Sequence, residues 1–285
     1  MDYLKWVENP PELNDPVLVV AFEGWNDAGE SATSAAEYII EHLDGTVFAE
    51  VDPQPFFDFT ETRPSVKIGE DGREILWPFN EFSYSERPDN NRDVIVFLGT
   101  EPQLQWRTYI EQIVQVIEEY RIELVISLGA LIAEVTHTRP STVYSTSDDI
   151  ALIESLDLEP SNYEGPTGII GVLQDTLKAT DSNILSLWAT IPGYVPHIPS
   201  PKAALALVQR VATIAGIEIP TSMLELNAGA YQSQINELVN EDPETQGYVT
   251  ELEEAYDSSM KPESGENLVK ELEQFLKDRD DPTGF

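Results

Sequence analysis

Cysteine is absent from the 285 residues, and basic residues are few. Without cysteine the chain can form no disulfide, no thiolate nucleophile and no zinc–thiolate site, which fits a reducing compartment. Only 16 lysines and arginines stand against 52 aspartates and glutamates, a formal net charge of −36 at pH 7. Because nucleic acids and anionic membranes bind clustered basic residues, neither is an expected partner.

Long apolar runs are also missing. No segment reaches the ~18 apolar residues of a membrane-spanning helix. The first sixteen residues carry acids and prolines, whereas a signal peptide needs a basic start and an apolar core. A cytoplasmic protein is therefore predicted, and its acidity serves mainly to keep it soluble.

Four short apolar runs alternate with helical patterns. The runs are Val17–Phe22, Asp93–Leu98, Leu124–Leu128 and Ile184–Ile191. Their apolar residues are continuous instead of alternating, which is typical of strands covered on both faces. Strands that alternate with helices predict an α/β fold, a three-layer sandwich with a mainly parallel mixed sheet.

Local signals place several helix ends and turns. Asp27 is the predicted N-terminal cap of the helix after the first strand, and Thr100 has the spacing of a capping box with Gln103. Residues 144–148, from Tyr144 to Asp148, predict a turn into a short helix. Residues 1–16 are expected to be a polar lead-in without regular structure.

Prolines crowd the segment from Asp52 to Pro88, which excludes a long helix there. We predict an insertion with short strands, including an edge hairpin around Asp71 and Gly72. Its aromatic residues favour a small local core over a binding platform.

No strand pattern follows Pro220. Three helices are predicted instead, over Met223–Val239, Pro243–Tyr256 and Glu263–Lys277, and mobile residues are predicted from Asp278 onward. The expected organisation is an α/β domain over residues 1–219 and an acidic helical extension over residues 220–285.

Familiar catalytic motifs are incomplete or absent in this sequence. The segment Gly24–Ser31 has the glycine spacing of a phosphate-binding loop, but Glu30 stands where lysine should neutralise phosphate. No serine lies in a G-x-S-x-G elbow. No short spacing of histidines supports a metal site, and no cofactor is expected.

Two of the three histidines follow core strands in proline-rich loops. His137 and His197 could converge with Asp27, Glu101 and Arg139 at the carboxyl edge of the sheet. Such a group could bind a small anion or perform acid–base chemistry. The competing interpretation, that these side chains satisfy backbone groups in ordered loops, is favoured.

Several motifs occur in order along most of the chain. They are Gly24–Gly29 after the first strand, Gly99–Pro102 with Trp106, Leu128–Leu131, His137–Pro140, Tyr163–Gly168, and Pro196 with His197. Together they resemble the bacterial branch of the proteasome assembly chaperone 2 family over about Leu18 to Leu238. The resemblance implies an α/β fold similar to purine nucleoside phosphorylases, oligomers, and, in eukaryotic members, chaperoning of proteasome α-ring assembly.

The strand-end loops and these motifs together give the candidate ligand- or partner-binding residues. They are Trp25, Asn26, Asp27, Glu101, Trp106, His137, Arg139, Glu164 and His197. Chaperone members dock through a C-terminal motif with tyrosine as its penultimate residue. Gly284 stands at that position here, so the resemblance does not extend to the docking motif.

Three functional hypotheses follow. The preferred one is a non-enzymatic oligomeric protein of the assembly-chaperone type that binds proteasome-related or other proteins, as a trimer by preference over a dimer. The second is a small-molecule-binding protein or a hydrolase- or phosphorylase-like enzyme that uses the strand-end loops. The third is a purely structural homo-oligomer organised by the acidic tail.

Overall fold

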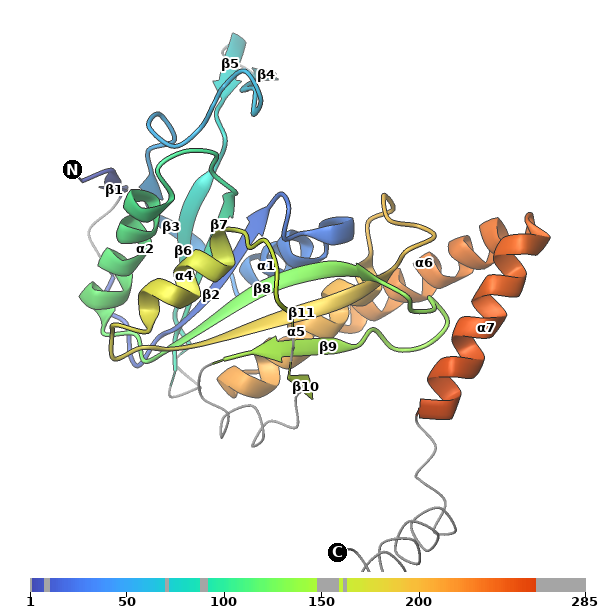
Figure 1. Cartoon of the computed structure of the whole chain (residues 1–285). Helices are drawn as coiled ribbons and strands as arrows, with labels where there is room; N and C mark the ends of the chain where they lie inside the picture. Colours follow the sequence, from blue (N-terminus) through green and yellow to red (C-terminus); the bar gives the residue numbers. More distant parts are fainter. Residues whose placement is uncertain are drawn as a thin grey trace, which may run out of the picture.

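The computed structural model describes residues 2–7, 11–69, 72–87, 92–147, 159–160 and 163–259. Four strands form the centre of its main sheet (Figure 1): β7 (Val94–Thr100), β2 (Val17–Glu23), β8 (Leu124–Ala133) and β11 (Asn183–Pro192). They lie side by side in that order and are all parallel. These are the four apolar runs of the sequence, so the predicted parallel core is confirmed.

Shorter strands extend the sheet on both sides. Beside β7 lie β6 (Asn80–Ser85), β3 (Thr46–Val51) and β1 (Leu4–Trp6), each antiparallel to its neighbour. Beside β11 lie β9 (Val143–Thr146), which is antiparallel to it, and β10 (Glu159–Pro160). The sheet of the described residues is therefore mixed and nine-stranded.

Two local predictions near the sheet edges are wrong. The polar lead-in contains β1, because Leu4 pairs with Val51 of β3. The turn predicted at residues 144–148 is the strand β9, since Tyr144 pairs with Trp188 of β11, and Asp148 lies outside the described residues. In both places pairing with a distant strand overrides weak local signals.

Helices cover both faces of the sheet. α1 (Ser31–His42) and α5 (Pro201–Ala215) pack on one face, and α2 (Trp106–Tyr120) and α4 (Ile169–Leu177) on the other. Alternate residues of β2 belong to the two cores: Val19 faces α1 and α5, while Val20 and Phe22 face α2 and α4. This arrangement confirms the three-layer sandwich.

α2 begins five residues later than the capping-box pattern around Thr100 suggests. The backbone amides of Gln103 and Leu104 donate hydrogen bonds to the carbonyl of Phe56. The loop before α2 is therefore held against the insertion, and the helix begins only after it. Gln105 then takes a left-handed conformation, with φ of 52°, immediately before Trp106.

Two further helices follow the sandwich, α6 (Ser222–Asn240) and α7 (Pro243–Ser259). α6 packs along α5, and both C-terminal helices bury a small core that includes Tyr231, Ile235 and Val249. The predicted third helix, Glu263–Lys277, and the last residues through Phe285 lie outside the described residues. The boundary between an α/β domain and a helical extension at residue 219 stays a prediction. In the described part of the chain, no helix has the length and apolarity needed to cross a membrane.

The predicted hairpin is present in the insertion. Strands β4 (Ser65–Gly69) and β5 (Gly72–Leu76) form a separate two-stranded antiparallel sheet, which we call the ribbon; Asp71 lies outside the described residues. Figure 1 shows the ribbon projecting from the body beyond α2. Phe56 and Phe57 of the same insertion are buried in the main core between the sheet and helices α2 and α4, not in a separate local core.

Candidate functional site

The carboxyl ends of β2 and β7 form one cluster of the predicted residues. Glu101, just after β7, accepts hydrogen bonds at Oε1 from Asn26 Nδ2 (3.0 Å) and from the backbone amide of Ile169 (2.8 Å). Its Oε2 lies 3.4 Å from the amide nitrogen of Trp25. We call Trp25, Asn26, Glu101 and Gly168 the edge cluster.

The backbone of the edge cluster depends on glycine at two places. Gly24 has φ of 135°, a conformation that favours glycine. A Cβ atom at Gly168 would lie 2.5 Å from Asn26 Nδ2 and 2.7 Å from Glu101 Oε1. The close packing leaves Asn26 Oδ1 buried, with no hydrogen-bond partner among the described residues.

Asp27 has a structural role beside this cluster. Its Oδ1 accepts from the amides of Ala32 (2.6 Å) and Thr33 (3.3 Å) in the first turn of α1, although the N-cap position of that helix is Glu30 and not Asp27 as predicted. Burial raises the pKa of this carboxyl above its ordinary value, although the hydrogen bonds from Thr33 and Ala32 oppose that shift.

We expect Glu101→Ala to lower the free energy of unfolding by about 2 kcal/mol, because the amide groups of Asn26 and Ile169 then lose their acceptor. Glu101→Gln keeps one acceptor oxygen and should cost less than half as much. Urea unfolding measures both. Glu164→Ala, at an exposed position, is the control and should change stability by under about 0.5 kcal/mol. Equal stability of Glu101→Ala and wild type would contradict this role for Glu101.

His137 lies in a second group of contacts, with α6. Its side chain is buried, with Nε2 2.9 Å from Asn236 Oδ1 and Nδ1 2.6 Å from the hydroxyl of Tyr194. Because an amide oxygen only accepts, Nε2 carries the proton and Nδ1 accepts from Tyr194. Burial lowers the pKa of His137, which keeps the ring neutral.

Two cations complete the attachment of the C-terminal helices. Arg139 donates from Nε and Nη2 to the two carboxylate oxygens of Asp257 on α7, at 2.8 and 2.7 Å. Lys202 on α5 donates to the His137 carbonyl and to Gln232 on α6. Burial and, to a lesser extent, the nearby Arg139 charge lower the pKa of Lys202 to about 8. We call the contacts of His137, Arg139 and Lys202 with α6 and α7 the latch.

The structure thus separates residues that could have formed one site. Among the described residues, no hydrogen bond or ion pair joins Asp27 or Glu101 to His137 or Arg139. The other candidates lie apart from both groups. Trp106 donates from Nε1 to the Pro102 carbonyl at 2.5 Å, and Glu164 and His197 are exposed. Within the same described ranges, no three acidic or histidine side chains could hold a metal ion.

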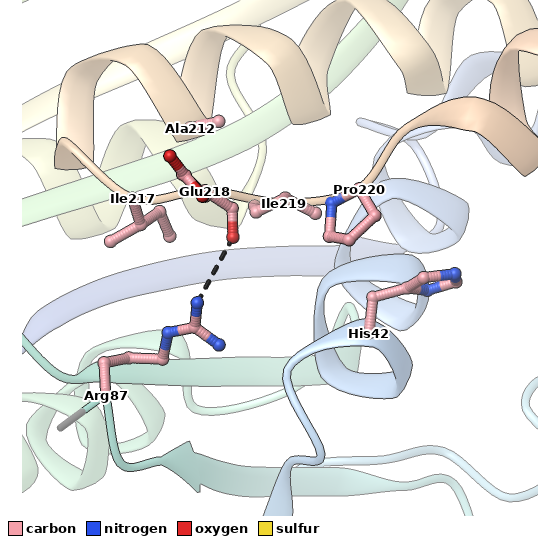
Figure 2. Close-up of a pocket in the computed structure, with 7 residues that line it drawn as sticks. All are labelled: His42, Arg87, Ala212, Ile217, Glu218, Ile219 and Pro220. Atoms are coloured by element: carbon pink, nitrogen blue, oxygen red, sulfur yellow. Dashed lines mark hydrogen bonds between the residues drawn. The ribbon is translucent and has the colours of Figure 1, made fainter. Parts of the chain in front are cut away.

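A pocket of about 550 Å³ lies at the opposite, amino end of the strands. It is formed where the segment Ile217–Pro220 passes Arg87, which follows the end of β6. Figure 2 shows the Arg87 guanidinium directed at the carbonyl of Glu218, a 3.3 Å hydrogen bond, and the His42 ring turned away from it. His42 stacks on Tyr38, in keeping with a structural role.

Sequence reasoning found Glu101 and His137 but missed most of their partners. The carboxylate of Glu101 accepts from the first amide of α4, which lies 68 residues further along the chain. Tyr194 and Asn236 lie 57 and 99 residues from His137. No local spacing signals contacts at such separations, and the same holds for Arg87 and the pocket.

A model of the PAC2 family matches residues 21–239. A solved structure of a PAC2 family protein from Streptomyces avermitilis is 38% identical, with a TM-score of 0.77; the match covers 82% of this chain and 100% of that one. A solved structure of a proteasome-assembly chaperone homologue from Mycobacterium tuberculosis is 35% identical, with a TM-score of 0.75. The match covers 82% of this chain and 99% of that one.

More distant structures share the fold. An archaeal proteasome activator from Pyrococcus furiosus is 22% identical over 82% of this chain and 97% of its own, with a TM-score of 0.67. At that identity the likeness shows the fold alone. No curated protein matches the chain.

Proposed function

Because the chain belongs to the PAC2 family, we propose that it is a non-enzymatic protein of the proteasome-assembly-chaperone type that acts by binding protein partners. The partners are proteasome-related proteins in the first instance. A solved relative that is 35% identical is described as a proteasome-assembly chaperone homologue, which supports this choice.

One observation supports the proposal most directly. The acidic side chains at the carboxyl edge of the sheet form hydrogen bonds within the chain, whereas aromatic side chains are exposed to solvent. Glu101 and Asp27 accept hydrogen bonds from their own backbone and side chains. In contrast, Trp25 is 61% exposed and Tyr163 is 67% exposed. Exposed aromatic rings are typical anchors of protein interfaces.

The alternative functions have weaker support. Small-molecule binding or hydrolase- or phosphorylase-like chemistry would need free acidic and basic side chains at one place. Here Glu101 is hydrogen-bonded within the edge cluster and His137 within the latch, which are separate groups of contacts. We further propose that the protein is a homo-oligomer, with a trimer preferred over a dimer, and that a cytoplasmic location accompanies this role.

Native mass spectrometry of the purified protein, alone and mixed with proteasome α subunits from the same organism, tests the proposal. We expect a stable complex with α subunits, and we expect Trp25→Ala to weaken it at least tenfold. Trp6→Ala is the matched control, because Trp6 is a partly exposed tryptophan on the edge strand β1.

Two results would overturn the proposal. One is the absence of any complex at micromolar concentrations of both proteins. The other is a co-purified small molecule that is lost in Glu101→Ala, which would instead establish a ligand site at the carboxyl edge.

A further inference from the structure

None of the residues that the structure describes covers the ribbon. All ten residues of β4 and β5 are exposed, and Figure 1 shows the ribbon clear of the sandwich. The exposed fractions are 59% for Val66, 78% for Ile68 and 57% for Ile75. A two-stranded hairpin is only marginally stable in water by itself, so apolar side chains on it favour a covering partner.

The register places these apolar residues on one face. Val66 pairs with Ile75, and Ile68 pairs with Arg73, so these four side chains point the same way. The other face carries the pair Lys67 and Glu74 and, at the end of the ribbon, Ser65 with Leu76, which is 41% exposed. One face of the ribbon is therefore mainly apolar, which is the pattern of a sheet face that packs against a surface.

Charge indicates what that surface is. On the apolar face, the single charged side chain among the described residues is the cation of Arg73. A complementary surface is apolar with a carboxylate beside it. The chain carries 52 acidic residues against 16 basic ones, so a second copy offers many more carboxylates than cations as partners for Arg73.

We propose that the apolar face of the ribbon packs on the body of a second copy of this chain. This inference rests on the proposed homo-oligomer and identifies the part of the chain that holds it together. Two ribbons packed face to face would bring two Arg73 cations into one small apolar contact, so contact between ribbon and body is favoured. A cyclic trimer is built from contacts between unlike surfaces, so contact between ribbon and body is compatible with the proposed trimer.

The test uses the full chain and measures mass against concentration by native mass spectrometry and light scattering. We expect an oligomer for the wild type. The triple variant Val66→Thr, Ile68→Thr and Ile75→Thr keeps β-branched residues but removes apolar surface, and should raise the dissociation constant roughly a hundredfold.

Two further variants make the result specific. Lys67→Thr with Glu74→Thr changes the opposite face by a similar amount and should leave the mass unchanged. Arg73→Glu should weaken association roughly tenfold at low salt and less at high salt, because the lost attraction is electrostatic. If the triple variant fails to fold, Arg73→Glu still tests the proposal.

Three results would overturn the inference. A monomeric wild type at all concentrations is one, and an unchanged mass of the triple variant is another. The third is an oligomer that survives in the triple variant while binding of α subunits is lost, because the ribbon would then contact that partner. Binding of α subunits by the wild type tests the proposed function separately.

Discussion

Phe97→Ala is expected to lower the free energy of unfolding by about 3–5 kcal/mol, the usual cost of truncating a buried phenylalanine. Phe97 is fully buried on β7, with its ring centroid 4.5 Å from Phe82 and 5.5 Å from Phe22. Tyr109 of α2 lies on the same cluster. The alanine side chain would leave a cavity lined by rings that neighbouring strands hold in place.

Urea unfolding followed by fluorescence and circular dichroism measures this loss. Total stabilities of domains are about 5–15 kcal/mol, so Phe97→Ala should unfold at a much lower urea concentration. Phe79→Ala is the control, because Phe79 is 36% exposed just before β6, and it should cost clearly less. Equal losses in the two variants would contradict the packing described for this core.

The second large effect is expected at the latch. His137→Ala should lower the free energy of unfolding by about 2–3 kcal/mol, because the Tyr194 hydroxyl and the Asn236 amide oxygen both lose a partner. The loss should be local at first. Hydrogen exchange should therefore speed up in α6 and α7 before it changes in the central strands.

His197→Ala is the matched control, because it removes the same side chain from an exposed position. It should change neither stability nor exchange. If His137→Ala leaves the exchange of α6 and α7 at wild-type rates, the latch does not hold these helices.

The latch should also respond to pH. Burial lowers the pKa of His137 in the folded protein below its ordinary value of about 6.5, so below that pH the unfolded chain binds more protons. The stabilisation is therefore complete above pH 6.5 and decreases as the pH falls through that value. Lys202 and Glu253 act on His137 in opposite directions and are both weaker causes than burial. The difference in stability between wild type and His137→Ala should shrink from pH 7.5 to pH 5.

The sequence predicted the centre of the fold because that part depends on composition. The strands β2, β7, β8 and β11 are continuous apolar runs, and such runs are buried in a parallel sheet whatever their neighbours are. The outer strands β1 and β9 are short, and β9 is partly polar, so their structure depends on pairing with distant residues. Local patterns do not contain that information.

The candidate site residues likewise divide into those whose contacts are local in the sequence and those whose contacts are distant. Asp27 was correctly expected to bind the start of the first helix because its partners Ala32 and Thr33 are five and six residues away, although Glu30 holds the N-cap position. Glu101 and His137 were correctly expected in strand-end loops. Their convergence with one another was not decided by the sequence, because it depends on how α4 and α6 pack, and these helices bind the two residues separately.

The latch and the central sheet also differ in how they resist mechanical force. β8 and β11 pair over ten residues in unbroken register, so a pull along the strands strains all of their hydrogen bonds together. α7 is held through discrete contacts such as Arg139 with Asp257, which can break one after another. A pull from the carboxyl side is therefore expected to detach α7 before it disrupts the sheet.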